Sequence, residues 1–182
     1  MASLDAMPLT QYYTASTLDG FIAGPDDSLE WLFTREQDHD GPLNYKAFIA
    51  DVGALAMGRT TYDWVLGHAS EGWPYDIPCW VFTHRDATHV PEADIRFTSD
   101  DVVSVHGEMR EAAGGKNLWI VGGGDLVGQF ADAGLLDEVI VYVAPVTLGS
   151  GKPLLPRHVE LALEETARNG DFVCARYSVV RA

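Results

Sequence analysis

The sequence predicts an α/β protein whose helices cover both faces of a mostly parallel sheet, in a three-layer αβα arrangement. Two observations carry this prediction. Short apolar runs alternate with segments of helical spacing along most of the chain, which is typical of parallel strands joined by helices. Near the end, the turn Asn169-Gly170-Asp171 separates strand-like runs over 161–168 and 172–180, so an antiparallel hairpin is expected at one edge of the sheet.

The first half of the chain supplies a strand, a loop and then alternating helices and strands. A strand is expected over 9–16, followed by a loop over 18–25 that glycines hold. Apolar residues recur at helical spacing over 43–51, which predicts a helix there. The next expected elements are a strand over 53–57, a helix over 60–66 with Thr60 or Thr61 near its N-terminus, and a strand over 79–83.

The second half continues the alternation. A weak strand is expected over 95–98, and a helix over 102–113 ends at a pair of glycines. A strand over 118–121 leads into three glycines, after which a helix runs to Ala133, where Gly134 stops it. The last predicted element before the hairpin is a long strand over 138–146.

Length and composition are those of one globular domain. With 182 residues, we expect a single domain over 9–182 after a short disordered lead over 1–8. No run approaches the roughly 18 to 20 apolar residues of a membrane span, and the start shows no signal-peptide pattern, so we expect a cytoplasmic protein. Cys79 and Cys174 lie far apart in apolar runs without metal-ligand spacing, which predicts two reduced core thiols and no metal site.

The formal net charge of −15 argues against nucleic acid and anionic membranes as partners, because both need basic faces. A small-molecule ligand is expected instead. The scarce cations then become informative if the ligand is an anion. Several of them lie beside glycine turns or strand ends, although each alone is equally well explained as a solubilising surface charge: Arg59, Arg85, Lys116, Lys152 and Arg157.

The glycine triplet is the most informative motif. Gly122, Gly123 and Gly124 lie between a buried strand and a helix that begins with Asp125, Leu126 and Val127. Glycine lets the backbone approach an anion without a Cβ clash, and a helix N-terminus offers free N–H groups and a positive dipole end. The pattern therefore predicts a phosphate site, with a simple tight turn as the alternative.

Two further strand ends carry residues of the phosphate-binding type. Gly58-Arg59-Thr60-Thr61 combines a glycine turn, a guanidinium and two hydroxyls at a helix start. Thr83-His84-Arg85 follows a strand and suits an adenosine ribose that carries a 2′-phosphate. Three such strand ends in one short chain favour a nucleotide cofactor, NADPH, over coincidence, although a surface position is the better explanation for His84 when it is taken alone.

These three segments resemble the NADPH-binding segments of dihydrofolate reductases. The whole chain is more similar still to the C-terminal reductase domain of the bacterial bifunctional riboflavin-biosynthesis deaminase/reductase. Residues 16–23 are similar to that group's S-x-D-G-x-I-A loop, and residues 136–139 and 144–151 are similar to its D-E and A-P-x-x-L-G segments. The resemblance spans nearly all of residues 9–180.

The resemblance implies a dihydrofolate reductase-like fold, NADPH as cofactor and a homodimer. It places the cofactor on the three segments above and on Ile22 of the loop, and it implies a cis peptide bond between Gly122 and Gly123. The edge formed by the strand over 139–146 and the terminal hairpin is rich in Val, Leu and Tyr, which favours pairing with a second copy.

The substrate half matches neither family fully. No zinc deaminase motif is present, Phe21 stands where the riboflavin reductases usually have a cation, and Asn44 and Tyr45 stand where dihydrofolate reductases place an acid. Asp19 is the acid of the loop, and we expect it to orient substrate or relay a proton, with a turn-forming role as the alternative. Trp31, Tyr45 and Phe48 are expected to wall a pocket for a planar ring, or else to form ordinary helix core.

Three functions remain open. The first is an NADPH-dependent reductase similar to 5-amino-6-(5-phosphoribosylamino)uracil reductase, acting on a pyrimidine-type or related small substrate. The second is a dihydrofolate reductase, which the missing helix acid disfavours. The third is a module that binds NADPH without catalysis. In the first two, the hydride comes from the cofactor, and the protein aligns the reacting carbons and excludes water.

Overall fold

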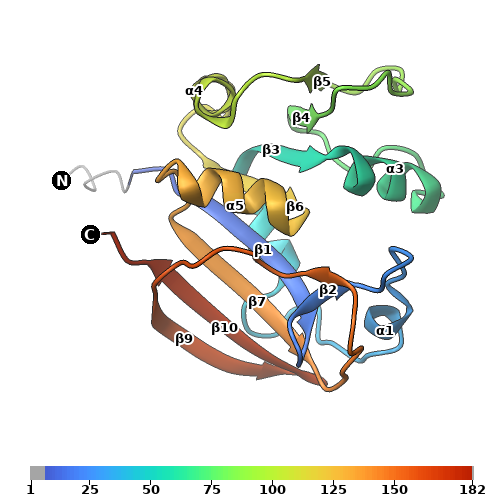
Figure 1. Cartoon of the computed structure of the whole chain (residues 1–182), viewed down its shortest axis with the longest axis vertical. Coiled ribbons are helices and arrows are strands. Elements are labelled where there is room, and N and C mark those ends of the chain that lie inside the picture. The colour runs from blue at the N-terminus through green and yellow to red at the C-terminus, as the bar shows by residue number, and fades with distance from the viewer. Residues whose placement is uncertain (1–6, 182) are drawn as a thin grey trace.

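The computed structural model describes residues 7–181, which form an eight-stranded sheet with helices on both faces (Figure 1). The predicted lead over 1–8 lies outside the described residues, apart from Met7 and Pro8. The strand order is β5-β4-β3-β6-β1-β7-β10-β9. The strands are β1 (Thr10–Thr17), β3 (Val52–Gly58), β4 (Cys79–Phe82), β5 (Ile95–Thr98), β6 (Asn117–Gly122), β7 (Glu138–Ala144), β9 (Leu161–Asn169) and β10 (Phe172–Val179).

The pairing confirms the predicted fold class. All neighbouring strands from β5 across to β7 run parallel, whereas β10 is antiparallel to both β7 and β9. The hairpin that Asn169-Gly170-Asp171 predicts is the β9–β10 pair. The helices are α1 (Glu30–Phe33), α2 (Tyr45–Ala50), α3 (Arg59–His68), α4 (Val102–Ala112) and α5 (Gly124–Asp132).

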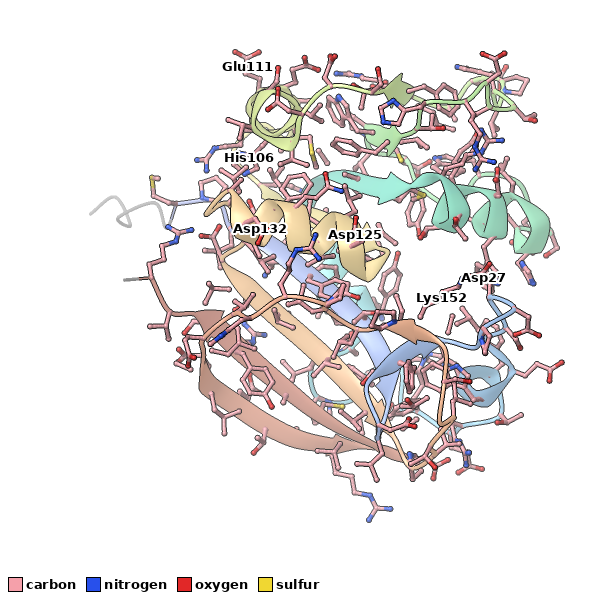
Figure 2. The ribbon with its side chains drawn as sticks, in the orientation of Figure 1. Asp27, His106, Glu111, Asp125, Asp132 and Lys152 are labelled. Carbon is pink, nitrogen blue, oxygen red and sulfur yellow. The ribbon has the colours of Figure 1, made fainter. Side chains whose placement is uncertain are left out.

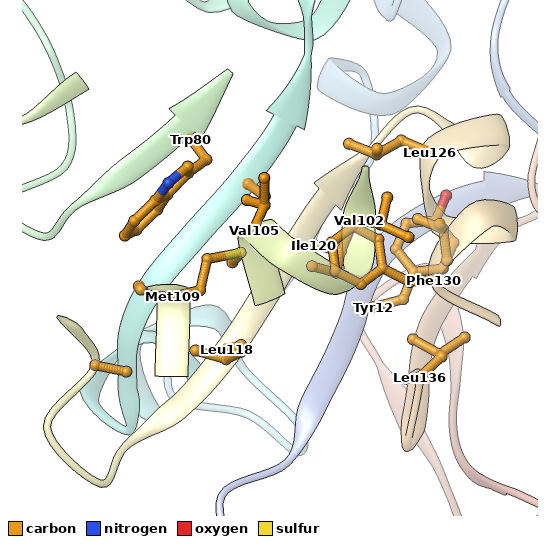
Figure 3. Packing of buried hydrophobic residues seen from close by; sticks show 14 of the residues in the cluster. Tyr12, Trp80, Val102, Val105, Met109, Leu118, Ile120, Leu126, Phe130 and Leu136 are labelled. Atoms are coloured by element: carbon orange, nitrogen blue, oxygen red, sulfur yellow. The ribbon is translucent and has the colours of Figure 1, made fainter. Parts of the chain in front are cut away.

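Each face of the sheet buries its own apolar cluster, because successive strand residues point to opposite sides. On β3, Ala54 and Ala56 belong to a cluster completed by α4 and α5, which Figure 3 shows from close by. Leu55 and Met57 belong to a second cluster that contains Tyr62 of α3 and contacts α2. The helices thus form the two outer layers, and the loops after the strands are left to build a site.

Short elements and boundaries account for the differences from the predicted elements. The helix predicted from residue 43 begins at Tyr45, because the Asn44 side chain accepts from the Ala47 N–H and caps it. The helix predicted from Thr60 already begins at Arg59, after Gly58. Helix α1 and the antiparallel pair of β2 (Phe21–Ala23) and β8 (Lys152–Pro153) were not predicted, since they are too short to show a period.

The prediction that the strand over 139–146 and the terminal hairpin form the edge of the sheet is partly wrong. β7 lies inside the sheet between β1 and β10, so only β9 of the terminal hairpin is an edge strand.

Both predicted core thiols, Cys79 and Cys174, are buried and free, and burial raises the pKa of the Cys174 thiol to about 11. Across residues 7–181, no helix combines the length and apolarity that a bilayer span requires.

Candidate functional site

A cavity of about 1590 Å³ opens where the parallel strands end. Its lining comes from the carboxyl ends of β3, β4, β5 and β6, from the first turns of α3 and α5, and from β1, β2 and α1. The elements that surround it can be followed on the right-hand side of Figure 1. Ligands of open α/β sheets bind outside the carboxyl ends of the strands, so the fold itself points to this cavity.

Two helix N-termini open into the cavity without a side-chain cap. Gly58 precedes α3 and Gly123 precedes α5, and neither offers a side-chain acceptor to the first N–H groups of its helix. In contrast, Asn44 caps α2 and Asp101 caps α4 through side-chain oxygens. The free N–H groups of α3 and α5 are therefore available to an anion at the cavity wall.

The glycine segment leaves open space beside the backbone. The Gly122–Gly123 peptide bond is cis, and Gly122 has a φ of 142° that favours glycine. A Cβ built on Gly123 meets nothing within 4 Å. Gly124 serves packing instead, because a Cβ there would stand 2.6 Å from the Leu154 carbonyl oxygen. A ligand can thus reach the backbone at Gly122 and Gly123, and the role of Gly124 is to let α5 pack closely against residues 153 and 154.

Most predicted cofactor residues line this one cavity. They are Ile22, Gly58, Arg59, Thr60, Thr61, Thr83, His84, Gly122, Gly123, Asp125 and Leu126. Gly124, Val127 and Arg85 do not line it. Val127 is fully buried in the core between α5 and the sheet, because its side chain points toward the sheet. The Arg85 side chain is exposed, and only its backbone meets the site, through Thr83.

Arg59 lies on the cavity wall in a fixed position. Its Nε donates to both carboxylate oxygens of Asp63, at 2.8 and 2.9 Å, and its Nη1 donates to the Asp86 carbonyl at 2.6 Å. Within residues 7–181, Nη2 has no hydrogen-bond acceptor. The guanidinium is thus oriented by the protein and keeps one donor group for a ligand.

The surroundings of Asp19 agree with the alternative that it forms a turn. Its side chain does not line the cavity, and its carboxylate accepts from the Thr17 hydroxyl at 2.6 Å and from the N–H groups of Leu148 and Gly149 at 3.1 and 2.7 Å. These hydrogen bonds lower the pKa of Asp19, and the bond from Thr17 has the largest effect. The carboxylate ties the turn after β1 to the segment after β7, and its expected part in orienting substrate or relaying a proton stays a prediction.

Trp31, Tyr45 and Phe48 were expected to wall a pocket for a planar ring or else to form helix core, and one of the three lies at the cavity. Tyr45 lines the cavity. Trp31 is buried in the cluster around Tyr142 and Phe172, and Phe48 stacks behind Tyr13 with ring centroids 4.3 Å apart. Trp31 therefore belongs to the core, and the half-buried Phe48 packs against it.

Other aromatic residues that line the cavity were not predicted from the sequence. Tyr13, Tyr75, Trp119, Trp64 and Phe33 line the cavity as well. Strand alternation does indicate that Tyr13 and Tyr12 point to opposite faces, but it does not say which face carries a cavity. Tyr75 follows α3 in a segment without a strand or helix period, so no pattern was available for it.

Within the described residues, no group of three or more His, Cys, Asp or Glu side chains is placed to hold a metal ion. The charged groups at the cavity are instead paired or spread out. Lys152 of β8 and Asp27, which lies in the turn after β2, are 3.6 Å apart and are labelled beside one another in Figure 2. The site therefore offers hydrogen-bond donors, aromatic faces and single charges.

Comparison with known proteins places the chain among reductase-like proteins. The model of the RibD C-terminal domain family matches residues 73–170. The uncharacterized protein YwjB of Bacillus subtilis is 34% identical over 92% of this chain and 96% of its own length.

Solved structures agree with this. A putative riboflavin biosynthesis protein from Shewanella sp. PV-4 has a TM-score of 0.80 at 26% identity, covering 95% of this chain and 99% of that one. Dihydrofolate reductase from Enterococcus faecalis, complexed with NADP(H), has a TM-score of 0.59 at 13% identity and covers 94% of this chain and 96% of its own. At that identity the second likeness shows the fold alone. Together the two likenesses confirm the predicted dihydrofolate reductase-like fold.

Proposed function

The chain belongs to the RibD C-terminal domain family, and we propose that it is an NADPH-dependent reductase that transfers hydride to a pyrimidine-type or related small planar substrate. The family and the structural relatives support a reductase-type activity. The observation that carries the proposal is the pair of uncapped helix N-termini, at α3 and α5, that open on one cavity beside an accessible glycine backbone.

The residues present fit a dinucleotide phosphate. The N–H groups at the start of α5, together with Gly122 and Gly123, would hold the pyrophosphate, since no Cβ occupies the space beside Gly123. Thr60, Thr61 and the free Nη2 of Arg59 lie at the start of α3 and would hold a second phosphate. Thr83 and His84 line the same region at the end of β4.

The chain's own part in the reaction is positioning. When bound, the nicotinamide supplies the hydride. The ends of β1 and β6 and the β2 strand would hold the reacting carbons together through Ala15, Ile22 and Val121, which line the cavity. These apolar side chains also exclude water from the transfer path. We propose that Asp19 does not supply the proton that the reduction requires, because its carboxylate is ionised and lies off the cavity.

We propose further that residues 9–182 act as one domain, that the protein works in the cytoplasm, and that it forms a homodimer through the edge strand β9. Leu161 and Leu163 on this strand are exposed, as is Val173 on β10, which supports pairing with a second copy. Light scattering at micromolar protein is expected to give the mass of two chains, and a mass of one chain would exclude the dimer.

The proposed activity is tested by NADPH consumption. The purified protein is mixed with NADPH and a panel of aminopyrimidines, pterins and dihydrofolate, and the absorbance at 340 nm is followed. We expect oxidation with at least one planar heterocycle and little with dihydrofolate. Preferred turnover of dihydrofolate would make the protein a dihydrofolate reductase, and tight NADPH binding without turnover of any compound would make it a binding module.

A further inference from the structure

One wall of the cavity consists of aromatic side chains from four separate segments. Tyr13 comes from β1, Tyr45 from α2, Tyr75 from the segment after α3, and Trp119 from β6. The ring centroids lie 5.8 Å apart for Tyr45 and Trp119, 5.9 Å for Tyr75 and Trp119, and 6.1 Å for Tyr13 and Tyr45. These are ordinary aromatic contact distances, so the four residues form one continuous surface, named here the aromatic wall.

Two hydroxyl groups of the aromatic wall have no hydrogen-bond partner within the described part of the chain. The Tyr13 hydroxyl donates to the Leu43 carbonyl at 3.0 Å, and Trp119 Nε1 donates to the Tyr13 carbonyl at 3.1 Å. No acceptor for the Tyr45 or Tyr75 hydroxyl lies among residues 7–181. Burial raises the pKa of both groups, so they are neutral hydrogen-bond donors at physiological pH.

The charges of the cavity do not form a further phosphate site for the substrate, apart from the two assigned to the cofactor. The Lys152 ammonium is paired with Asp27 at 3.6 Å, and Arg59 is paired with Asp63 at the start of α3. Arg35 lines the cavity and has no carboxylate partner among the described residues, but its Nε donates to the Trp31 carbonyl at 3.3 Å. This one guanidinium, together with the exposed His39 ring that also lines the cavity, falls short of the several donors that usually surround a phosphate.

Helix N-termini do not supply the missing donors. Those of α3 and α5 serve the cofactor in the proposed function, and that of α2, next to the aromatic wall, is closed by the Asn44 side chain. The net charge of −15 adds a general repulsion against a dianion. Desolvating a phosphate dianion would be costly where two tyrosine hydroxyls are the donors on the aromatic wall.

We propose that the substrate is a neutral, planar aromatic or heteroaromatic compound without a phosphate group, which packs on the aromatic wall and accepts hydrogen bonds from Tyr45 and Tyr75. This inference rests on the proposed reductase function, because it assigns the phosphate-binding helix ends to the cofactor. Flat rings bury large area against aromatic faces, and two placed donors fix their orientation. The reaction that supplies this substrate must then deliver it without a phosphate, or after a phosphate has been removed.

Calorimetric titration with two matched pairs tests the proposal: uridine against uridine 5′-monophosphate, and riboflavin against riboflavin 5′-phosphate. NADP⁺ is titrated first, and the pairs are then titrated at saturating NADP⁺, which cannot donate hydride. For each pair in which binding is detected, we expect the neutral member to bind at least about tenfold tighter, equal to about 1.4 kcal/mol. Tyr45→Phe and Tyr75→Phe should each weaken that binding several-fold, whereas Tyr177→Phe, which lies off the cavity, and Arg35→Ala should not.

Tighter binding of the phosphorylated members, lost in Arg35→Ala, would overturn the proposal. Binding of neither member of either pair, in a protein that binds NADP⁺, would overturn it as well. Absence of NADP⁺ binding is a separate result that removes the proposed function. The pairs are then titrated without NADP⁺, and a phosphate preference there counts against the aromatic-wall assignment in the same way. Thermal unfolding of each variant shows whether the fold is intact.

Discussion

Arg157 lies against the first turn of α5, with its Nη2 2.9 Å from Oδ1 of Asp125. The same guanidinium reaches along the helix, where its Nε lies 2.8 Å from Oδ2 of Asp132 (Figure 2 labels both acids). Gly128 allows this approach, since a Cβ there would stand 2.8 Å from Arg157 Cγ. The pairing with Arg157, and then the bond from Gln129, lower the pKa of Asp125.

This pair explains how an acid is tolerated at a proposed phosphate site. Asp125 lines the cavity beside the free N–H groups of α5, where an unpaired carboxylate would repel a phosphate. Arg157 offsets that charge. Arg157→Ala is therefore expected to weaken NADPH binding by about tenfold at low salt, with a smaller effect as ionic strength rises. Fluorescence titration of NADPH measures the change.

A double variant separates this effect from a loss of packing. Arg157→Ala combined with Asp125→Asn should recover most of the NADPH affinity, because the uncompensated charge is removed. The matched control combines Arg157→Ala with Asp132→Asn, since Asp132 shares the same guanidinium but does not line the cavity. Equal recovery in both double variants, or none in either, would contradict the charge explanation.

Arg59 is expected to set the preference for NADPH over NADH. Its Nη2 is free at the cavity wall, whereas the Arg85 side chain does not line the cavity. Arg59→Ala should weaken NADPH binding by about 1.5 to 3 kcal/mol, the range for a charge-assisted hydrogen bond, and leave NADH binding nearly unchanged. Arg85→Ala removes the same charge and serves as the control. A similar loss for both cofactors in Arg59→Ala would refute the assignment to a phosphate.

Gly123→Ala tests the open space beside the glycine backbone. The added methyl group meets no protein atom within 4 Å, so the melting temperature should change little, while NADPH affinity should fall by at least about tenfold because the methyl occupies the phosphate position. Gly67→Ala on α3 also meets no atom within 4 Å and lies off the cavity, so it should keep full affinity and add up to about 1 kcal/mol of stability. Unchanged NADPH binding in Gly123→Ala would place the cofactor elsewhere.

Asp19→Ala should affect stability and not proton transfer. The pKa of Asp19 is lower in the folded protein than in the unfolded chain. Its contribution to the free energy of unfolding is therefore fully present above the ordinary pKa of a carboxyl group, and it is lost as the pH falls through the pKa of the folded state. Thermal melts should thus show the variant less stable than wild type at pH 7, with the difference shrinking below about pH 4. The pH profile of kcat should keep its shape. A profile shifted by Asp19→Asn would restore a catalytic role.

The fold was predictable because its signals are local and repeated. The strand ends before Gly58 and Gly122 each show an apolar run, a glycine and a helix start, and those three steps are enough to place a parallel strand and its crossover. The end of β4 was predicted from its apolar run and from the Thr83-His84-Arg85 cluster that follows it, without a glycine or a helix start. Residues at these ends converge because parallel strands finish at the same edge of the sheet, which is why most predicted cofactor residues meet at one cavity.

The substrate half was not predictable to the same degree. Asp19 was assigned to chemistry from its place in a loop, but its partners Leu148 and Gly149 lie far along the chain and become visible only when the loops are packed together. The same limit applies to Trp31 and Tyr75, because nothing near either residue in the sequence indicates whether its ring faces the core or the cavity. Side-chain direction in short or irregular segments depends on tertiary contacts, which spacing does not encode.

Calorimetric titration of NADPH into the wild-type protein tests whether the cavity at the strand ends binds the cofactor. We expect one NADPH per chain, with a dissociation constant in the micromolar range or below, which equals a binding free energy of about −8 kcal/mol or stronger, and NADH binding at least about tenfold weaker. No binding of NADPH up to millimolar concentration, or equal binding of the two cofactors with no response to Gly123→Ala, would contradict this expectation.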